Sequence, residues 1–205
     1  MSTRDERKDR GNGDERSRDT GYRASVRYFE RYRNIGIKKT NKFAKQVNEG
    51  YLKSRKKDTA VDVEIRLISV EMDEMWSYYH DKSHQIWLWW AVDHETNVPL
   101  AYTFGTREPK YLDELLALLK PFPIGTIYAD NNYAYRERFS TNMLVSGKKN
   151  TQKIERNHLT LRTRIKRLCR KTICFSKNKD IHIAVIGTFI NIFYFGRYFD
   201  ASTIL

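Results

Sequence analysis

Three strand-like runs lie close together in the middle of the chain: IRLISVEMDEMWSYY (65–79), QIWLWWAVD (85–93) and PLAYTFG (99–105). β-Branched and aromatic residues are frequent in these runs, and the second run is almost continuously apolar. Residues of these types favour strands. The segments between the runs are short and polar, as in the turns of hairpins. This stretch therefore predicts an antiparallel meander of three strands.

The next part of the chain alternates between helix and strand patterns. EPKYLDELLALLK (108–120) places its leucines on one face and ends before Pro121, which predicts an amphipathic helix. The following runs are shorter and predict a strand, a helical turn and a second strand: GTIYAD (125–130), AYRERFS (134–140) and NMLVSG (142–147).

Two further helices are predicted towards the C-terminus. The run 152–171 carries an inward stripe made of Ile154, His158, Leu161, Ile165 and Leu168. On this stripe we expect His158 to be a packed, hydrogen-bonded histidine. The run 181–199 is mostly apolar and predicts a buried helix. The order of elements predicts a mixed α/β fold with one central sheet flanked by helices.

Residues 1–58 differ in composition from the rest and predict a basic N-terminal extension. Alternating charges, glycine and serine without apolar periodicity predict a disordered charged arm over 1–20. Residues 21–48 contain two amphipathic patches around Asn34–Gly36. They fit either a helix-turn-helix or its remnant, or a basic pair of surface helices of no defined role. LKSRKKD (52–58) is interpreted as a solvated basic linker.

Neither a secretory signal nor a membrane anchor is predicted. The N-terminus has no apolar segment, and the apolar run 181–196 is shorter than the roughly 20 residues that span a bilayer. This run also contains His182 and Asn191. Two cysteines, Cys169 and Cys174, are too few for a disulfide framework or a four-ligand zinc site. We therefore expect a cytoplasmic protein with no membrane partner.

The charge of the chain indicates a polyanionic partner. Thirty-eight Lys and Arg against 25 Asp and Glu give a formal net charge of +13, which makes nucleic acid the leading candidate. The charge is uneven: net +9 over residues 1–58, −6 over 59–147 and +11 over 148–179. The last block contains a single acid, Glu155, among 12 basic residues. An acidic centre between two basic blocks is hard to explain as a generic solvated surface.

Three carboxylates are the candidate catalytic and metal-binding groups. Asp73 lies near the end of the first predicted strand, Asp130 ends the strand 125–130, and Glu155 lies near the start of the basic helix. If the two strands are neighbours, the acids meet at one sheet edge, where ligands of open α/β sheets bind. Carboxylates gathered in this way need cations, and their oxygens suit Mg²⁺ or Mn²⁺. Two such ions would serve an in-line displacement at phosphorus.

These acids, with their flanking residues, resemble the transposases of the insertion-sequence-one family. The matching strings include EMDEMWSYY around Asp73, IYADNNYAY around Asp130 and TQKIERNHLTLRTRIKRLCRK around Glu155. The resemblance extends over about residues 65–199. It implies an RNase H-like fold, in which three antiparallel strands are followed by parallel ones. It also implies catalysis by the three acids and a phosphate contact by Arg162, seven positions after the glutamate.

On this resemblance, residues 59–205 form the RNase H-like catalytic domain. One feature departs from the family, whose members usually carry an N-terminal zinc-binding module with paired cysteines. Residues 1–60 contain no cysteine here.

The sequence thus predicts a DNA transposase that uses Mg²⁺ or Mn²⁺ to cleave transposon ends and to transfer the strand into target DNA. A homo-oligomer is expected, because two ends must be joined in one complex, and so is a nucleoid-associated location in a prokaryotic cytoplasm. Two alternatives stay open, a nuclease of the same fold without strand transfer and a non-catalytic DNA-binding remnant acting as a repressor. The expected phosphate-binding residues are Lys153, Arg156, Arg162 and Lys166.

Overall fold

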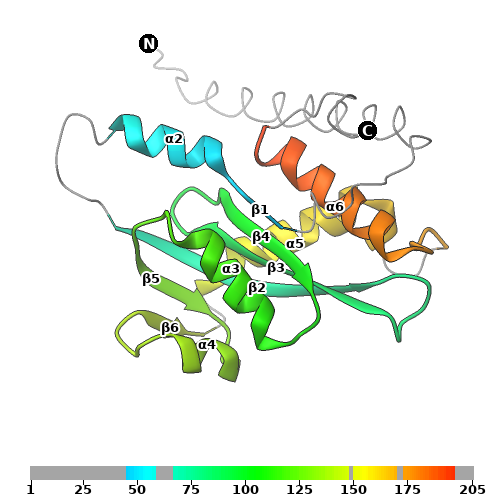
Figure 1. Cartoon of the computed structure of the whole chain (residues 1–205), viewed down its shortest axis with the longest axis horizontal. Helices are drawn as coiled ribbons and strands as arrows, with labels where there is room; N and C mark the ends of the chain where they lie inside the picture. The colour runs from blue at the N-terminus through cyan, green and yellow to red at the C-terminus, as the bar shows by residue number, and fades with distance from the viewer. Residues whose placement is uncertain (1–44, 59–66, 148–149, 170–172, 197–205) are drawn as a thin grey trace, which may run out of the picture.

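A mixed six-stranded sheet forms the centre of the computed structural model, which describes residues 45–58, 67–147, 150–169 and 173–196 (Figure 1). The elements in chain order are β1 (Lys45–Val47), α2 (Glu49–Asp58), β2 (Ile68–Tyr78), β3 (Gln85–Asp93), β4 (Pro99–Gly105), α3 (Pro109–Leu119), β5 (Ile124–Ala129), α4 (Tyr133–Arg138), β6 (Leu144–Ser146), α5 (Gln152–Arg164), the 3₁₀ helix η3 (Lys166–Leu168) and α6 (Lys179–Phe193).

The strand order confirms the RNase H-like arrangement. It is β1-β4-β3-β2-β5-β6. β2, β3 and β4 form the predicted antiparallel meander, whereas β5 pairs parallel to β2 and β6 pairs parallel to β5. A parallel strand cannot be reached by a tight turn, so α3 and α4 serve as the crossovers to β5 and β6.

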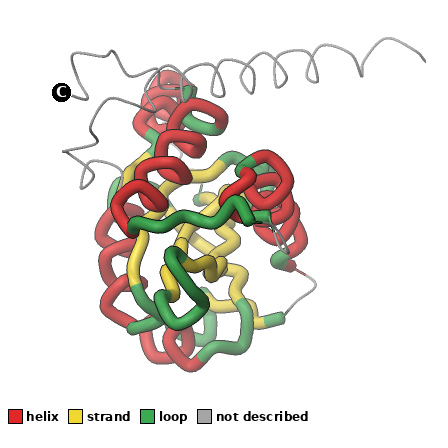
Figure 2. Tube along the Cα trace, turned by 90° about the vertical axis from the view of Figure 1, so that its right-hand side faces the viewer, coloured by secondary structure: helices red, strands yellow, loops and turns green. Residues whose placement is uncertain are grey.

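The sheet separates two hydrophobic clusters, because successive side chains of a strand point to opposite faces. Trp89 and Trp90 show this directly, since both are fully buried and each belongs to a different cluster. One cluster contains the inward residues of α3 and α4, and the other contains those of α5, η3 and α6. Figure 2 accordingly shows the strands between two groups of helices. Strand β2 crosses the centre of this arrangement.

Helix caps agree with the sequence pattern. The side chain of Asn132 accepts a hydrogen bond from the Ala134 N–H at the start of α4. The side chain of Asn178 caps α6 by accepting from the Asp180 and Ile181 N–H groups, so α6 begins at Lys179, two residues before its predicted start. α6 is apolar on most of its surface because most of its residues are buried. No helix in the described part of the chain is long and apolar enough to cross a membrane.

The interpretation of residues 52–58 as a solvated linker is wrong, because they lie in helix α2. Lys and Arg are good helix formers, so a basic composition does not by itself distinguish a linker from a surface helix. Tertiary contacts decide the case. The Tyr51 hydroxyl donates a hydrogen bond to Asp93, and Leu52 packs against the cluster beneath α3.

Strand β1 was not predicted either. Lys45 falls in the segment 21–48, for which a helix-turn-helix or a pair of surface helices was expected, but it pairs with Thr103 at the edge of the sheet. Residues 1–44 lie outside the described residues. The charged arm, most of the helix-turn-helix and the domain boundary at residue 58 therefore stay predictions.

The long basic helix is shorter than predicted. α5 ends at Arg164, and Ile165 is extended, with φ −104° and ψ 102°. This break before η3 lets both Ile165 and Leu168 remain buried, as the predicted stripe requires.

A core substitution tests the packing of α3. Leu115→Ala should lower the free energy of unfolding by about 2–5 kcal/mol, because Leu115 is fully buried between α3 and the sheet. Leu159→Ala is the control, since 61% of Leu159 is exposed, and it should change stability by no more than about 0.5 kcal/mol. Urea unfolding monitored by tryptophan fluorescence measures both values. Equal losses in the two variants would contradict the assignment of this core.

Candidate active site

The two aspartates lie at the same edge because β2 and β5 are parallel neighbours. Glu71 lies opposite Tyr128 in this pair, and the same offset of 57 residues places Asp73 opposite Asp130. Asp73 is in the middle of β2 rather than near its end as predicted, and it is β5 that ends at this level. The structure therefore brings together the two acids as the sequence analysis expected.

Glu155 reaches this edge from the first turn of α5. Burial and the neighbouring charges of Glu74, Asp130 and Glu155 together raise the pKa of the Asp73 carboxyl to about 7, although the Glu74 N–H, which donates to Asp73 at 2.8 Å, acts to lower it. A carboxylate responds in this way only to charges that are close by. The three predicted acids thus form one electrostatic unit.

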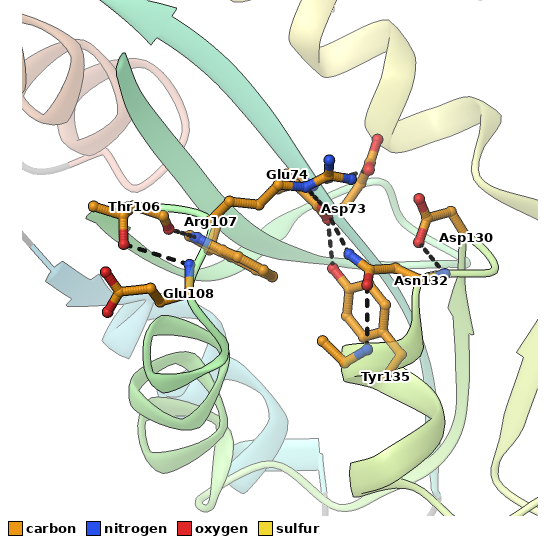
Figure 3. A network of polar contacts seen from close by, with 10 residues as sticks. Asp73, Glu74, Thr106, Arg107, Glu108, Asp130, Asn132 and Tyr135 are labelled. Carbon is orange, nitrogen blue, oxygen red and sulfur yellow. Dashed lines mark hydrogen bonds and ion pairs between the residues drawn. The ribbon is translucent and has the colours of Figure 1, made fainter. Parts of the chain in front are cut away.

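Glu74 is a fourth acid of this site and was not among the predicted site residues. Its side chain is 3% exposed. The carboxylate accepts hydrogen bonds from Asn132 Nδ2 at 3.0 Å and from the Tyr135 hydroxyl at 3.1 Å, and Arg107 Nε lies 3.5 Å away (Figure 3). Burial raises the pKa of Glu74, and the charge of Asp130 raises it further.

Asn132 connects Glu74 to Asp130. Its backbone N–H donates to Asp130 Oδ1 at 3.0 Å, while its side-chain amide donates to Glu74. Its side-chain oxygen caps α4, so one residue fixes the loop that carries Asp130 (Figure 3). This position was not among the predicted site residues. A short polar residue two positions after an acid at a strand end was the available signal.

His158 is packed and hydrogen-bonded, as expected. Trp90 Nε1 donates to His158 Nε2 at 2.8 Å, and the two rings stack with centroids 5.5 Å apart. Burial and the positive charge of Arg162 lower the pKa of His158 to about 3. Because Nε2 accepts a hydrogen bond, the proton of the neutral ring lies on Nδ1, 3.6 Å from Asp73 Oδ2. Because the ring is neutral, this contact is not an ion pair.

The four predicted phosphate-binding residues do not share one environment. Arg156 and Lys166 are exposed, whereas Arg162 is half-buried. Lys153 donates to the backbone carbonyls of His94 and Glu95, so its ammonium group is held at the turn between β3 and β4. Arg162 lies seven positions after Glu155, which puts both on the same face of α5. Lys166 follows the break at the end of this helix.

A separate group of metal-type ligands lies on the turn between β2 and β3. Among the described residues, single ligand atoms of His80, Asp81 and His84 lie within 4.8 Å of one another. All three residues are exposed, and the Asp81 carboxylate already accepts hydrogen bonds from the backbone N–H and hydroxyl of Ser83. These bonds are typical of a polar turn.

The chain matches known proteins over more than half of its length. A family model described as IS1 transposase matches residues 66–196. "Insertion element iso-IS1n protein InsB" of Shigella dysenteriae is 53% identical over 120 residues, which are 58% of this chain and 92% of that protein. "Insertion element IS1 protein InsB" of Shigella sonnei is 39% identical over 126 residues, 62% of this chain and 96% of that protein.

A solved structure gives a weaker match. The catalytic core domain of BIV integrase aligns with 62% of this chain and 83% of its own length, with 12% identity and a TM-score of 0.41. The assignment of the fold rests on the strand order of the sheet.

The raised pKa of Asp73 predicts that this residue destabilises the metal-free protein at high pH. Its pKa in the folded chain, about 7, exceeds the ordinary value of 3.8, so ionisation is less favourable in the folded state. The contribution of protonated Asp73 to the free energy of unfolding is fully present below about pH 4 and is lost as the pH rises through 7. Asp73→Asn should therefore raise the free energy of unfolding at pH 8 by up to about 4 kcal/mol, and by less at pH 5.

Urea unfolding in the presence of EDTA measures this difference. Asp113→Asn is the control, because the Arg138 guanidinium lowers the pKa of Asp113, and its loss should not stabilise the protein. An Asp73→Asn variant that is no more stable than the wild type at pH 8 would contradict the predicted repulsion.

Proposed function

Because the chain belongs to the IS1 transposase family, we propose that its action on DNA is carried out by Asp73, Asp130 and Glu155 as the catalytic and metal-binding residues. The reaction is the cleavage of a phosphodiester bond at a transposon end, followed by transfer of the strand into target DNA. The cofactor is Mg²⁺ or Mn²⁺, bound as two ions.

One observation supports this proposal most strongly. The acids come from three elements, β2, the end of β5 and α5, and yet the charges of Asp130 and Glu155 both raise the pKa of Asp73. A purely structural role as partners of an ion pair does not account for these acids, because their charges repel one another. A site that concentrates negative charge in this way is typical of cation binding.

The residues present fit a divalent metal ion. Their donors are carboxylate oxygens, the ligand type that Mg²⁺ and Mn²⁺ prefer, and no thiolate or imidazole donor is required. Bound divalent ions would supply charge neutralisation at the scissile phosphate and lower the pKa of the attacking water. The raised pKa of Asp73 also implies that ion binding is accompanied by loss of its proton.

The chain's own groups then perform two displacements with one set of ligands. In the first, a water oxygen bonds to phosphorus while the bond to the 3′ oxygen breaks, which releases a 3′-hydroxyl. In the second, that hydroxyl bonds to a phosphorus of the target strand, and a target 3′ oxygen leaves. Asp73, Asp130 and Glu155 keep their positions throughout, since only the nucleophile changes.

Basic residues around α5 hold the DNA backbone against this acidic centre. Arg156 is exposed next to Glu155, and Arg162 lies on the same helix face two turns further on, where it would contact a terminal nucleotide phosphate. Lys166 extends the basic surface beyond the helix. Lys153 acts closer to the site, beside the turn between β3 and β4. These contacts position the duplex without reading its sequence.

Joining two transposon ends requires more than one copy of the chain, so the active form is a homo-oligomer on DNA. Its place in the cell would be the nucleoid of a prokaryotic cytoplasm.

Glutamine at position 155 tests the catalytic assignment. Glu155→Gln should lower the rate of DNA cleavage at least about 10³-fold, because one carboxylate ligand is lost, while the Kd for DNA stays within about twofold. Glu114→Gln on α3 is the matched control and should cleave normally, since Glu114 binds Thr103 away from the site. Gel assays with a labelled transposon end measure cleavage and joined products separately. Unchanged cleavage by Glu155→Gln would refute the assignment, and cleavage without joined products would indicate a nuclease.

The dependence of DNA affinity on salt tests the basic surface. Arg156→Ala and Lys166→Ala should each weaken binding equally for specific and random duplexes and reduce the slope of log K against log[salt] by about 1. Lys110→Ala on α3 is the control, because Lys110 pairs with Glu108 and lies outside this surface. Fluorescence anisotropy from 50 to 200 mM salt measures the slopes. If the control and the two variants give the same slope, the basic surface lies elsewhere.

A further inference from the structure

Glu71 is a buried acid that the proposed chemistry does not use. It lies on β2 two residues before Asp73, and therefore on the same face of the strand. Its side chain is only 1% exposed. A buried carboxylate destabilises the fold unless its oxygens are hydrogen-bonded, so its partners indicate what it does.

The two partners of Glu71 come from different elements. Oε2 accepts a hydrogen bond from the backbone N–H of Ile154 at 3.0 Å. Oε1 lies 2.7 Å from Nδ1 of His94, which follows β3. The ring of His94 packs against Tyr128 at 4.4 Å, and its backbone N–H donates to the Ser69 carbonyl. The carboxylate is thus held in place from the side of the sheet.

The Ile154 amide belongs to the first turn of α5, where N–H groups have no acceptor within the helix and the helix dipole favours a negative charge. Glu71 supplies this acceptor from the neighbouring strand. The next residue along α5 is Glu155. The Glu71 carboxylate therefore connects strand β2 to the first turn of α5 through its hydrogen bond with Ile154. Asp73 lies two residues after Glu71 on the strand, and Glu155 follows Ile154 on the helix.

We propose that Glu71 is a positioning residue, whose hydrogen bond to the Ile154 amide sets the separation of Glu155 from Asp73 and thereby completes the metal site. This inference rests on the proposed function of those two acids. Residues that orient metal ligands without touching the ion typically change metal affinity 10–100-fold when they are substituted. For this role the length of the Glu71 side chain matters more than its charge, because its oxygen must extend to the Ile154 N–H of α5.

Two conservative substitutions distinguish the effect of side-chain length from the effect of charge. Glu71→Gln keeps the side-chain length, an oxygen that accepts from Ile154 and an N–H that can face His94, but it loses the charge. Glu71→Asp keeps the charge but withdraws the carboxylate by about 1.5 Å, one carbon–carbon bond, which breaks the 3.0 Å contact. Glu114→Asp on α3 is the matched control for shortening a glutamate outside the site.

Calorimetric titration of the full chain with Mn²⁺, in the absence of DNA, measures the result. We expect Glu71→Asp to weaken Mn²⁺ binding about tenfold or more and to raise the Mn²⁺ concentration for half-maximal DNA cleavage to the same extent, while Glu71→Gln and Glu114→Asp stay within about threefold of the wild type. Thermal unfolding identifies the folded samples on which the affinities are compared.

The inference is overturned if Glu71→Asp binds Mn²⁺ like the wild type, because the length of the side chain is then irrelevant to the metal site. Weakened binding by Glu71→Gln alone would likewise assign the effect to charge. A wild-type chain that binds no Mn²⁺ and cuts no DNA would overturn the proposed function itself. A failure of the positioning role alone gives a different result: the wild type and Glu71→Asp then both bind Mn²⁺ and cut DNA normally.

Discussion

Like charges held together in a partly desolvated site are the constraint on which the arrangement of this protein depends. Three acids from distant parts of the chain lie close enough for two of them to raise the pKa of Asp73. In the metal-free protein this repulsion opposes folding, so the surrounding structure must be rigid enough to hold the acids in place. A packed cluster on each face of the sheet provides that rigidity. Binding of cations would relieve the repulsion.

Strand β2 organises the site because its side chains alternate between the two faces. Asp73 faces α5, and Glu74 faces α4 on the opposite side. Each face contributes a different support: Asn132 fixes the loop of Asp130 through Glu74, and Glu71 contacts the first turn of α5. Acids that look redundant in the sequence therefore have distinct partners.

Much of the fold could be predicted because it is encoded in local periodicity. The bounds of β3 and β4 coincide with the predicted runs, and the leucine face of α3 is buried as expected. The errors concern segments whose state depends on distant partners. β1 becomes a strand only by pairing with β4, and α2 is stabilised by contacts of Tyr51 and Leu52 with residues that are far away in sequence.

Local patterns along the chain were enough to predict the class of the fold, the family and three candidate acids, because periodic side chains and flanking motifs are properties of short segments. That these acids meet depends on tertiary packing, since the parallel pairing of β2 with β5 sets the register of Asp73 and Asp130. The same packing gives Glu71 and Glu74 their hydrogen-bond partners, which lie 83 and 58 residues away along the chain. Hydrogen bonds over such separations leave no periodic signal in the sequence, because they depend on how strands and helices pack.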